Sequence, residues 1–151
     1  MLQLKIPPPI YALLTALVMW LSSQYIPVAQ LIKEPVNNVG IVLMLLALCM
    51  DFSSLYLFFK KRTTPNPMKP EFTTGLVTHG FYKISRNPMY LGMLTILFGL
   101  AIYLGNLTAF LVLPAFYFVI TEMQIKPEEQ MLEQKFGEEY LDYKSKVRRW
   151  L

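Results

Sequence analysis

The stretch MYLGMLTILFGLAIYLGNLTAFLVLPAFYFVITEMQI, Met89 to Ile125, decides the fold because it places two apolar segments one after the other. Met89 to Leu104 and Leu107 to Ile125 are separated by a single Gly-Asn pair, which is typical of a turn. A helix rises about 1.5 Å per residue and the hydrocarbon core of a bilayer is about 30 Å thick, so roughly 17 to 25 apolar residues span it. The sequence therefore predicts an antiparallel hairpin of two membrane-spanning helices.

Two further apolar segments lie nearer the N-terminus. Ile10 to Ile26 follows three consecutive prolines, and Val39 to Phe59 is the longest apolar segment of the chain. The composition agrees, because 54% of the residues are apolar and the mean hydropathy is +0.39. We therefore expect one all-α domain over residues 1–151, a polytopic integral-membrane protein with about four transmembrane helices.

The basic residues indicate which side of the membrane each end of the chain faces. If the N-terminus is cytosolic, 13 of the 14 Lys and Arg residues fall on the cytosolic side, in Lys5, the loop 60–88 and the segment from Lys126 onward. Only Lys33 falls outside. The positive-inside rule therefore predicts a protein of the inner (cytoplasmic) membrane with both termini in the cytosol. The net charge of +4 reflects this orientation, and no basic stripe with interleaved aromatic residues predicts nucleic-acid binding.

A basic turn with a proline precedes the hairpin, in GFYKISRNPMYLG, Gly80 to Gly92. Asn87 and Pro88 form a favoured helix start, as N-cap and first-turn residue of the third span. Arg86 then has two interpretations. It is either one more cytosolic positive charge or part of a functional site, because a tyrosine lies four residues to either side of it. Gly92 adds to the second interpretation, since a glycine lets another group approach the helix backbone closely.

A second polar segment, IKPEEQMLEQKFGEEYLDYKSKVRRWL, Ile125 to Leu151, follows the hairpin directly. Its proline and the two acids after it stabilise any helix start, by about 0.3 to 1 kcal/mol per charge through the helix dipole. We expect one cytosolic amphipathic helix over residues 127–147, lying on the membrane surface or on the protein's own cytosolic face. Gly137 in its middle costs roughly 1 kcal/mol relative to alanine, which hints at close packing or a bend. The predicted apolar stripe consists of Leu132, Phe136, Tyr140, Tyr143 and Val147.

Asp51 is an ionisable residue inside the second span. An ionisable group at that depth is a functional candidate and should face the interior of the bundle. The alternative, which we favour, is a structural hydrogen bond to Ser53, Ser54 or a neighbouring span. No metal site is expected, because the single histidine, His79, and the single cysteine, Cys49 in the second span, do not make one.

Together the two polar segments resemble the catalytic half of the isoprenylcysteine carboxyl methyltransferase family, which is related to the integral-membrane phospholipid methyltransferases. The residues that carry the resemblance are GLVTHGFYKISRNPMYLG followed by PEEQMLEQKFGEEYLDYKSKVRRW, and the likeness covers roughly residues 65–151. It implies S-adenosylmethionine-dependent methyl transfer to a lipophilic or membrane-associated acceptor, with a carboxylate, a thiol or an amine as the nucleophile.

Carried over residue by residue, the resemblance implies a cofactor site between the hairpin and the C-terminal segment. Arg86 and Glu129 are the candidate catalytic residues: Arg86 would bind the cofactor carboxylate or an anionic substrate. Glu129 would order Arg86 or one of the C-terminal arginines, Arg148 and Arg149. Family members that methylate a prenylcysteine carboxylate carry an arginine where this chain has Gln124, and the missing cation puts a carboxylate acceptor in doubt. The implied cofactor contacts are Thr74, Gly75, Leu76, Val77, Tyr82, Asn87, Pro88, Met89, Tyr90 and Glu128.

Two other functions stay open at this point. The chain could be a small four-helix transporter or channel subunit centred on Asp51, which predicts no affinity for the cofactor. It could also be a membrane scaffold that docks a partner through its C-terminal helix. The sequence makes no prediction about the oligomeric state.

Overall fold

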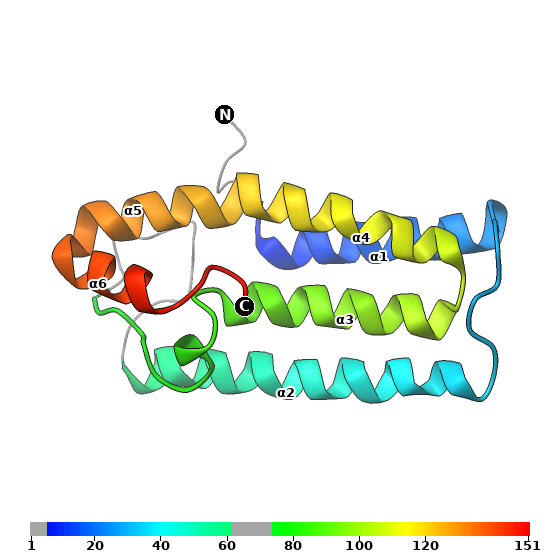
Figure 1. Ribbon diagram of the computed structural model, residues 1–151, viewed down its shortest axis with the longest axis horizontal. Coiled ribbons are helices and arrows are strands. Elements are labelled where there is room, and N and C mark those ends of the chain that lie inside the picture. Colours follow the sequence, from blue (N-terminus) through cyan, green and yellow to red (C-terminus); the bar gives the residue numbers. More distant parts are fainter. Residues whose placement is uncertain (1–5, 62–73) are drawn as a thin grey trace.

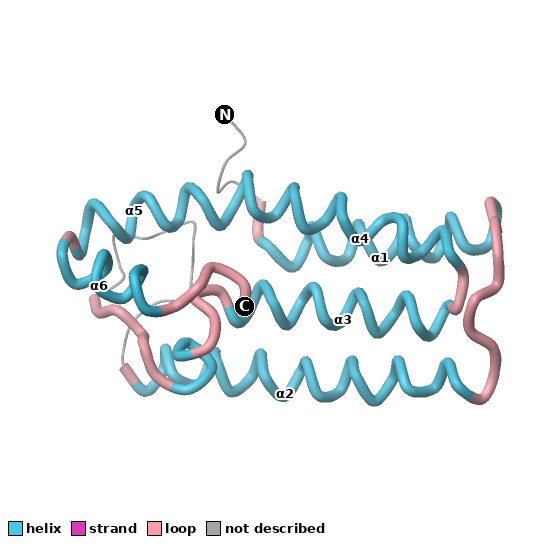
Figure 2. Tube along the Cα trace, in the orientation of Figure 1, coloured by secondary structure: helices cyan, strands magenta, loops and turns pink. Residues whose placement is uncertain are grey.

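A computed structural model describes residues 6–61 and 74–151 of the chain. Four long helices run side by side and alternate in direction (Figure 1). The third is the central one, because it packs against each of the other three. The described residues contain no β-strand, so the predicted all-α class is confirmed (Figure 2). The four helices are α1 (Pro8–Tyr25), α2 (Val39–Lys60), α3 (Pro88–Leu104) and α4 (Leu107–Ile120).

Each predicted span corresponds to one of these helices, and the largest difference is at the end of the fourth. There α4 stops at Ile120, and a π-helical turn, Thr121–Ile125, joins it to α5 (Lys126–Phe136). The α-helical pattern thus changes for one turn without a break in the chain direction, and α4 and α5 form one continuous rod (Figure 1). Two short 3₁₀ turns, Val36–Asn38 and Gly80–Lys83, precede α2 and α3.

Two helical stretches of the described chain are long and apolar enough to cross a membrane, Val36–Lys60 and Leu107–Phe136. Helix α3 is apolar but shorter, with 17 residues. Helix α1 has 18 residues but is not among the two, because prolines begin it and polar residues end it. Two candidate spans are therefore shown, and the four-span topology stays a prediction.

Large apolar side chains of α1 and α2 face outward. Leu13 is 69% exposed, and Leu46 is 62% exposed. A soluble protein rarely leaves such a contiguous apolar surface uncovered, whereas the acyl chains of a bilayer would cover it. The outward direction of these side chains therefore fits a helix bundle surrounded by lipid.

The predicted turn between α3 and α4 is confirmed. Gly105 ends α3 in the left-handed conformation, with a φ of 66°. The Asn106 side chain then caps α4, because its Oδ1 accepts a hydrogen bond of 3.1 Å from the backbone N–H of Thr108. At the same end of the bundle, α2 approaches α3 so closely that a Cβ added to Gly40 would overlap the carbonyl oxygen of Gly99.

The prediction of one helix over residues 127–147 is wrong. The structure has α5, which ends at Phe136, and a separate α6 (Glu138–Lys146). Gly137 divides them with φ 52° and ψ −123°, a backbone conformation that residues with a side chain rarely adopt. A Cβ added there would meet nothing within 4 Å, so the reason for the glycine is the bend and not close packing. Helix α6 consequently folds back toward the start of α3 (Figure 1).

The predicted apolar stripe survives this bend. Tyr140 and Tyr143 are buried against Leu76, and the other three members of the stripe pack around them. The stripe therefore covers the protein's own loop before α3, which was one of the two predicted locations. This contact brings the C-terminal segment to the start of α3.

Candidate functional site

The two polar segments meet at one end of the bundle, where α3 begins and the chain ends (Figure 1). Arg86 and Glu129 join them: Arg86 donates a hydrogen bond of 2.7 Å from one terminal nitrogen, and one of 3.3 Å from Nε, to Oε1 of Glu129. The other terminal nitrogen of Arg86 donates to the carbonyl oxygens of Lys144, at 3.1 Å, and Val147, at 2.7 Å. Both charged side chains are buried, with 8% and 7% exposed. The Arg86 guanidinium is thus occupied by the C-terminal segment.

Glu129 also binds a second arginine. Arg149 donates from a terminal nitrogen to Oε2 of Glu129 at 2.7 Å, and its Nε lies 3.1 Å from each carboxylate oxygen. These hydrogen bonds raise the pKa of the Arg149 guanidinium above its already high value. One carboxylate therefore holds two guanidinium groups, one from the turn before α3 and one from the end of the chain. Glu129 lies where it can order both, as expected for the role predicted for it.

Backbone contacts complete this attachment. The Arg86 N–H donates to the carbonyl oxygen of Arg148 at 2.9 Å. The Asn87 side chain donates to the carbonyl oxygen of Arg149 at 3.0 Å, and the Ser85 hydroxyl donates to the same oxygen at 3.2 Å. The predicted N-cap is thus only half right. Asn87 occupies the N-cap position before Pro88. Its side chain, however, donates to the C-terminal segment and does not cap the first turn of α3.

Glu128 faces a different part of the site from Glu129. The Tyr90 hydroxyl donates a hydrogen bond of 2.9 Å to Oε2 of Glu128, and the Tyr90 side chain is buried. No donor in the described part of the chain bonds the other oxygen, Oε1. This bond is a second link between α3 and α5. It uses Oε2 of Glu128, so Oε1 is available to a ligand.

Tyr82 lies under the same region. Its ring is buried edge-on against Phe58, with ring centres 5.6 Å apart, and its carbonyl oxygen accepts a hydrogen bond of 2.7 Å from the Tyr143 hydroxyl. Burial raises the pKa of the Tyr82 phenol well above its usual value, and the negative charges of Glu128 and Asp51 raise it further. Tyr82 thus joins α2, through Phe58, to α6, through Tyr143.

The segment Thr74 to Val77 runs beside the C-terminal helices. Leu76 and Val77 are buried, and the Leu76 carbonyl oxygen accepts a hydrogen bond of 2.5 Å from the Lys61 ammonium group. Their side chains are therefore used for packing. Gly75 is different, because a Cβ added to it would meet nothing within 4 Å, which leaves its backbone accessible. Met89, at the start of α3, is partly buried.

A family model described as phospholipid methyltransferase matches residues 36–139, more than half of the chain. The chain belongs to the phospholipid methyltransferase family. Over 112 residues it is 28% identical to protein-S-isoprenylcysteine O-methyltransferase A of Arabidopsis thaliana, an alignment that covers 74% of this chain and 57% of that protein. Over 63 residues, 42% of this chain, it is 52% identical to the whole of an uncharacterized protein of Haemophilus influenzae. No solved structure matches the chain.

The predicted relationship is confirmed by the family match. A phospholipid methyltransferase family member with helices apolar enough to cross a bilayer is a membrane methyltransferase. The family match also begins at residue 36, so it includes α2, for which the sequence showed only a general likeness. Within residues 6–61 and 74–151, no group of three or more His, Cys, Asp or Glu side chains could hold a metal ion.

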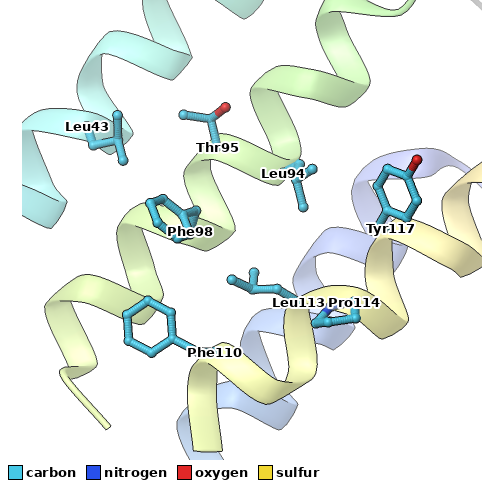
Figure 3. Close-up of a pocket in the computed structure, with 8 residues that line it drawn as sticks. All are labelled: Leu43, Leu94, Thr95, Phe98, Phe110, Leu113, Pro114 and Tyr117. Atoms are coloured by element: carbon cyan, nitrogen blue, oxygen red, sulfur yellow. The ribbon is translucent and has the colours of Figure 1, made fainter. Parts of the chain in front are cut away.

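An apolar groove lies on the outside of the bundle, beside the site formed by the two polar segments. Its volume is about 620 Å³, and Tyr117 forms its end nearest the C-terminus, where the ring stacks on Trp150 with centres 5.0 Å apart. Side chains of α3 and α4 face each other across it (Figure 3). The lining residues are Leu43, Leu94, Thr95, Phe98, Phe110, Leu113, Pro114 and Tyr117.

Sequence reasoning was partly right about Asp51, because its carboxylate faces the interior of the bundle as predicted. The predicted hydrogen bond to Ser53 or Ser54 is wrong, because the Ser53 hydroxyl donates to the carbonyl oxygen of Cys49 and the Ser54 hydroxyl has no partner in the described chain. The Asp51 carboxylate lies instead against the backbone of α3, where a Cβ at Gly92 would overlap its Oδ1. The sequence contains both residues of this contact, an acid in one span and a glycine in the next. No feature of the sequence predicts that they meet.

Proposed function

We propose that the protein is an S-adenosylmethionine-dependent methyltransferase, one domain over residues 1–151, that acts on a lipophilic acceptor at the membrane surface. The observation that carries this proposal is the junction of the two motif segments. Tyr90 bonds Glu128, and Arg86 bonds Glu129, so both segments contribute to one site. These bonds join the two segments directly, across 38 residues of sequence in the case of Tyr90 and Glu128, which supports a shared site.

The chemistry of the available groups fits this cofactor. S-adenosylmethionine carries an ammonium group, a carboxylate, ribose hydroxyls and a sulfonium. Oε1 of Glu128 can accept a hydrogen bond from the ammonium group or a ribose hydroxyl. Two hydrogen-bond donors of the C-terminal segment, the Tyr140 hydroxyl and the Trp150 indole N–H, are buried without a partner in the described chain. Buried polar atoms of this kind require an explanation, and a polar ligand supplies one.

The cofactor, when bound, supplies a methyl group that its sulfonium already activates. The protein then has to orient the reactants, a contribution that can amount to several kcal/mol of the barrier. In the proposal Arg86 and Glu129 do not contact the reactants, because their charges are already paired with each other and with Arg149. They are positioning residues that hold the C-terminal segment over the site.

The remaining residues implied by the family resemblance keep the role of cofactor contacts in this proposal. Glu128 and Tyr90 supply polar groups and Gly75 supplies an accessible backbone. The other members of that set are Thr74, Leu76, Val77, Tyr82, Asn87, Pro88 and Met89.

The membrane topology in this proposal has four spans, with both termini in the cytosol. The rod Leu107–Phe136 has 30 residues, about 45 Å of helix, which exceeds the hydrocarbon thickness by roughly 15 Å. Its polar part, α5, extends beyond the start of α3 (Figure 1). Among the residues that the structure describes, the basic ones other than Lys33 gather at this end, whereas Lys33 lies in the connection at the opposite end. A lipophilic acceptor could then enter between helices while the cofactor enters from water.

Two structural observations weigh against the other functions. A transporter centred on Asp51 needs that carboxylate on an open path, but it lies in the contact between α2 and α3. A scaffold needs the apolar face of its C-terminal helices free for a partner, but Leu76 covers Tyr140 and Tyr143 on that face. Methyl transfer is therefore the function that the site supports best.

The test is an equilibrium titration of purified protein in detergent with radiolabelled S-adenosylmethionine. The wild type should bind in the micromolar range. Glu128→Gln should weaken binding about 10- to 100-fold, because a hydrogen bond to a charged group is lost. The matched control is Glu122→Gln, which removes an exposed carboxylate paired with Lys126 and should bind like the wild type. Equal affinities of the wild type and Glu128→Gln would refute the site assignment.

A further inference from the structure

A second groove lies on the outside of the bundle, between α2 and the turn before α3. Its volume is about 660 Å³. The part of α2 that lines it is the last two turns before Lys60, where the candidate span Val36–Lys60 ends. In a bilayer the groove therefore lies where the acyl chains meet the head groups. The lining residues are Phe52, Ser53, Tyr56, Leu57, Gly80, Phe81 and Ile84.

The fold holds the two walls of this groove together. The 3₁₀ turn Gly80–Lys83 packs against the end of α2 (Figure 1). The buried Tyr82 ring of this turn meets Phe58 edge-on, with ring centres 5.6 Å apart. Gly80 has a φ of 62°, and a Cβ added to it would lie 2.9 Å from Cδ1 of Leu57, so a larger residue would push the walls apart.

The surface of the groove suits a hydrocarbon chain. Phe52 and Tyr56 on the α2 wall are exposed, as are Phe81 and Ile84 on the opposite wall. Apolar patches of this kind mark contacts with a membrane or another apolar partner. Tyrosine is enriched at the level of the head groups, which is where the end of α2 places Tyr56.

Two lysines stand at the polar end of the groove. Lys60 follows Tyr56 by four positions, so it lies on the same face of α2, one turn nearer the end of the helix. Lys83 lies in the turn between Phe81 and Ile84, which both line the groove. Both lysines are exposed, and neither ammonium group has a hydrogen-bond or ion-pair partner within residues 6–61 and 74–151.

Other lysines at this end of the molecule are already bonded. Lys126 and Lys146 each pair with an acid four positions earlier in the same helix. Lys144 pairs with Glu133, and Lys61 donates to the carbonyl oxygen of Leu76. The two lysines beside the groove thus differ from these four in having charges that are free to bind an anion.

This combination selects the head group of the lipid. An acyl chain fits the apolar walls, and two ammonium groups at their polar end attract a phosphate. A zwitterionic head group also carries a cation, which the lysines repel. A lipid with a net negative head group therefore matches the groove best.

We propose that this groove binds a phospholipid with an anionic head group, its acyl chain between Phe52 and Phe81 and its phosphate between Lys60 and Lys83. The lipid is a bound partner of the fold and takes no part in methyl transfer, so the inference does not depend on the function proposed above. The groove is also distinct from the proposed cofactor site, because the two lie on different sides of the turn. Tyr82 faces the bundle interior, and its carbonyl oxygen is bonded to Tyr143 of α6.

The test is native mass spectrometry of the full chain in detergent, titrated with dioleoyl phosphatidylglycerol or dioleoyl phosphatidylcholine. The two lipids have the same acyl chains and differ in the charge of the head group. The first phosphatidylglycerol should bind about 30-fold more tightly than the first phosphatidylcholine, from about 5-fold for each lysine near an anionic lipid. Glycerol phosphate, which has the anion without the chains, should not displace it at the same concentration.

Three variants separate the groove from the overall positive charge of this end. Lys60→Gln combined with Lys83→Gln should lower the affinity for phosphatidylglycerol about 30-fold, to that for phosphatidylcholine. The matched control, Lys126→Gln combined with Lys146→Gln, removes the same charge from exposed lysines that are already paired, and should keep the wild-type preference. Ser53→Phe fills the groove and should abolish the tight binding while both lysines remain. The Ser53 hydroxyl donates to Cys49 of its own helix, so all three variants should keep the wild-type circular dichroism spectrum.

Equal affinities of the wild type for the two lipids would overturn the proposal. Equal losses in the two double variants would also overturn it, because they would show a diffuse attraction to the positive end of the molecule. Displacement of the lipid by glycerol phosphate, or unchanged tight binding to Ser53→Phe, would show that the groove does not hold the acyl chain.

Discussion

Replacing Glu129 with alanine removes the carboxylate that holds two arginines and, through them, the C-terminal segment. Arg86, whose side chain is 8% exposed, would lose both of its side-chain hydrogen bonds to Glu129. Breaking a buried ion pair by removing one partner costs about 3 to 5 kcal/mol, because it leaves an uncompensated charge. The Arg149 side chain is 35% exposed, so its half of the cluster contributes less, about 1 kcal/mol or below. We therefore expect the free energy of unfolding to fall by about 3 to 6 kcal/mol in total.

Hydrogen exchange measured by mass spectrometry, on protein in detergent, can assign this loss to a region. The amides of α6 and the residues after it should exchange faster in Glu129→Ala, while those of α2 and α3 should change little. The control is Glu133→Ala, which removes a carboxylate from the same helix. The partner of this carboxylate, Lys144, is 39% exposed, so the free energy of unfolding should change by less than about 1 kcal/mol. If Glu129→Ala accelerates exchange in α6 no more than Glu133→Ala does, the two arginines do not hold the C-terminal segment.

Three further predictions concern the same end of the molecule. Gly137→Ala should lower the free energy of unfolding by about 1 kcal/mol or more, because alanine resists the positive φ there, and a thermal melt that is unchanged would contradict the bend. Tyr143→Phe should cost about 1 to 3 kcal/mol in the same melt, since it leaves the carbonyl oxygen of Tyr82 buried without its donor; a neutral result would rule out that bond. Burial raises the pKa of Tyr82, Tyr140 and Tyr143, so the folded protein keeps phenol protons that the unfolded chain releases above about pH 10. Stability should therefore fall as the pH rises above about 10, and a flat alkaline profile would contradict the burial of these rings.

The sequence predicts the hairpin for local reasons, whereas the meeting of the two motifs is what the family resemblance implies. A left-handed glycine followed by a capping asparagine determines the turn at Gly105 and Asn106, and both residues act on their immediate neighbours. Glu129 could be expected to bind an arginine because it is a carboxylate beside a basic C-terminus. The turn needs only short-range chemistry, and the structure contains it; the bonds of Glu129 to Arg86 and Arg149 join residues that are distant in sequence.

The features that the sequence missed depend on contacts between distant segments. The Asn87 side chain leaves its capping position for a carbonyl oxygen of Arg149, 62 residues away. A mid-helix glycine costs only roughly 1 kcal/mol, so the pattern alone did not distinguish a strained helix from the bend at Gly137. The contact of Asp51 with Gly92 follows from how closely α2 approaches α3, and no periodicity in either helix encodes that distance.

The central claim is that the turn before α3 and the segment after α4 form one cofactor site. Ultraviolet cross-linking of tritiated S-adenosylmethionine to the wild-type protein, followed by mass spectrometry of the labelled peptides, tests it most directly. We predict label in both regions, residues 80–92 and residues 127–151, and its loss when excess S-adenosylhomocysteine competes. Label confined to other helices, or label that the competitor does not remove, would contradict the claim.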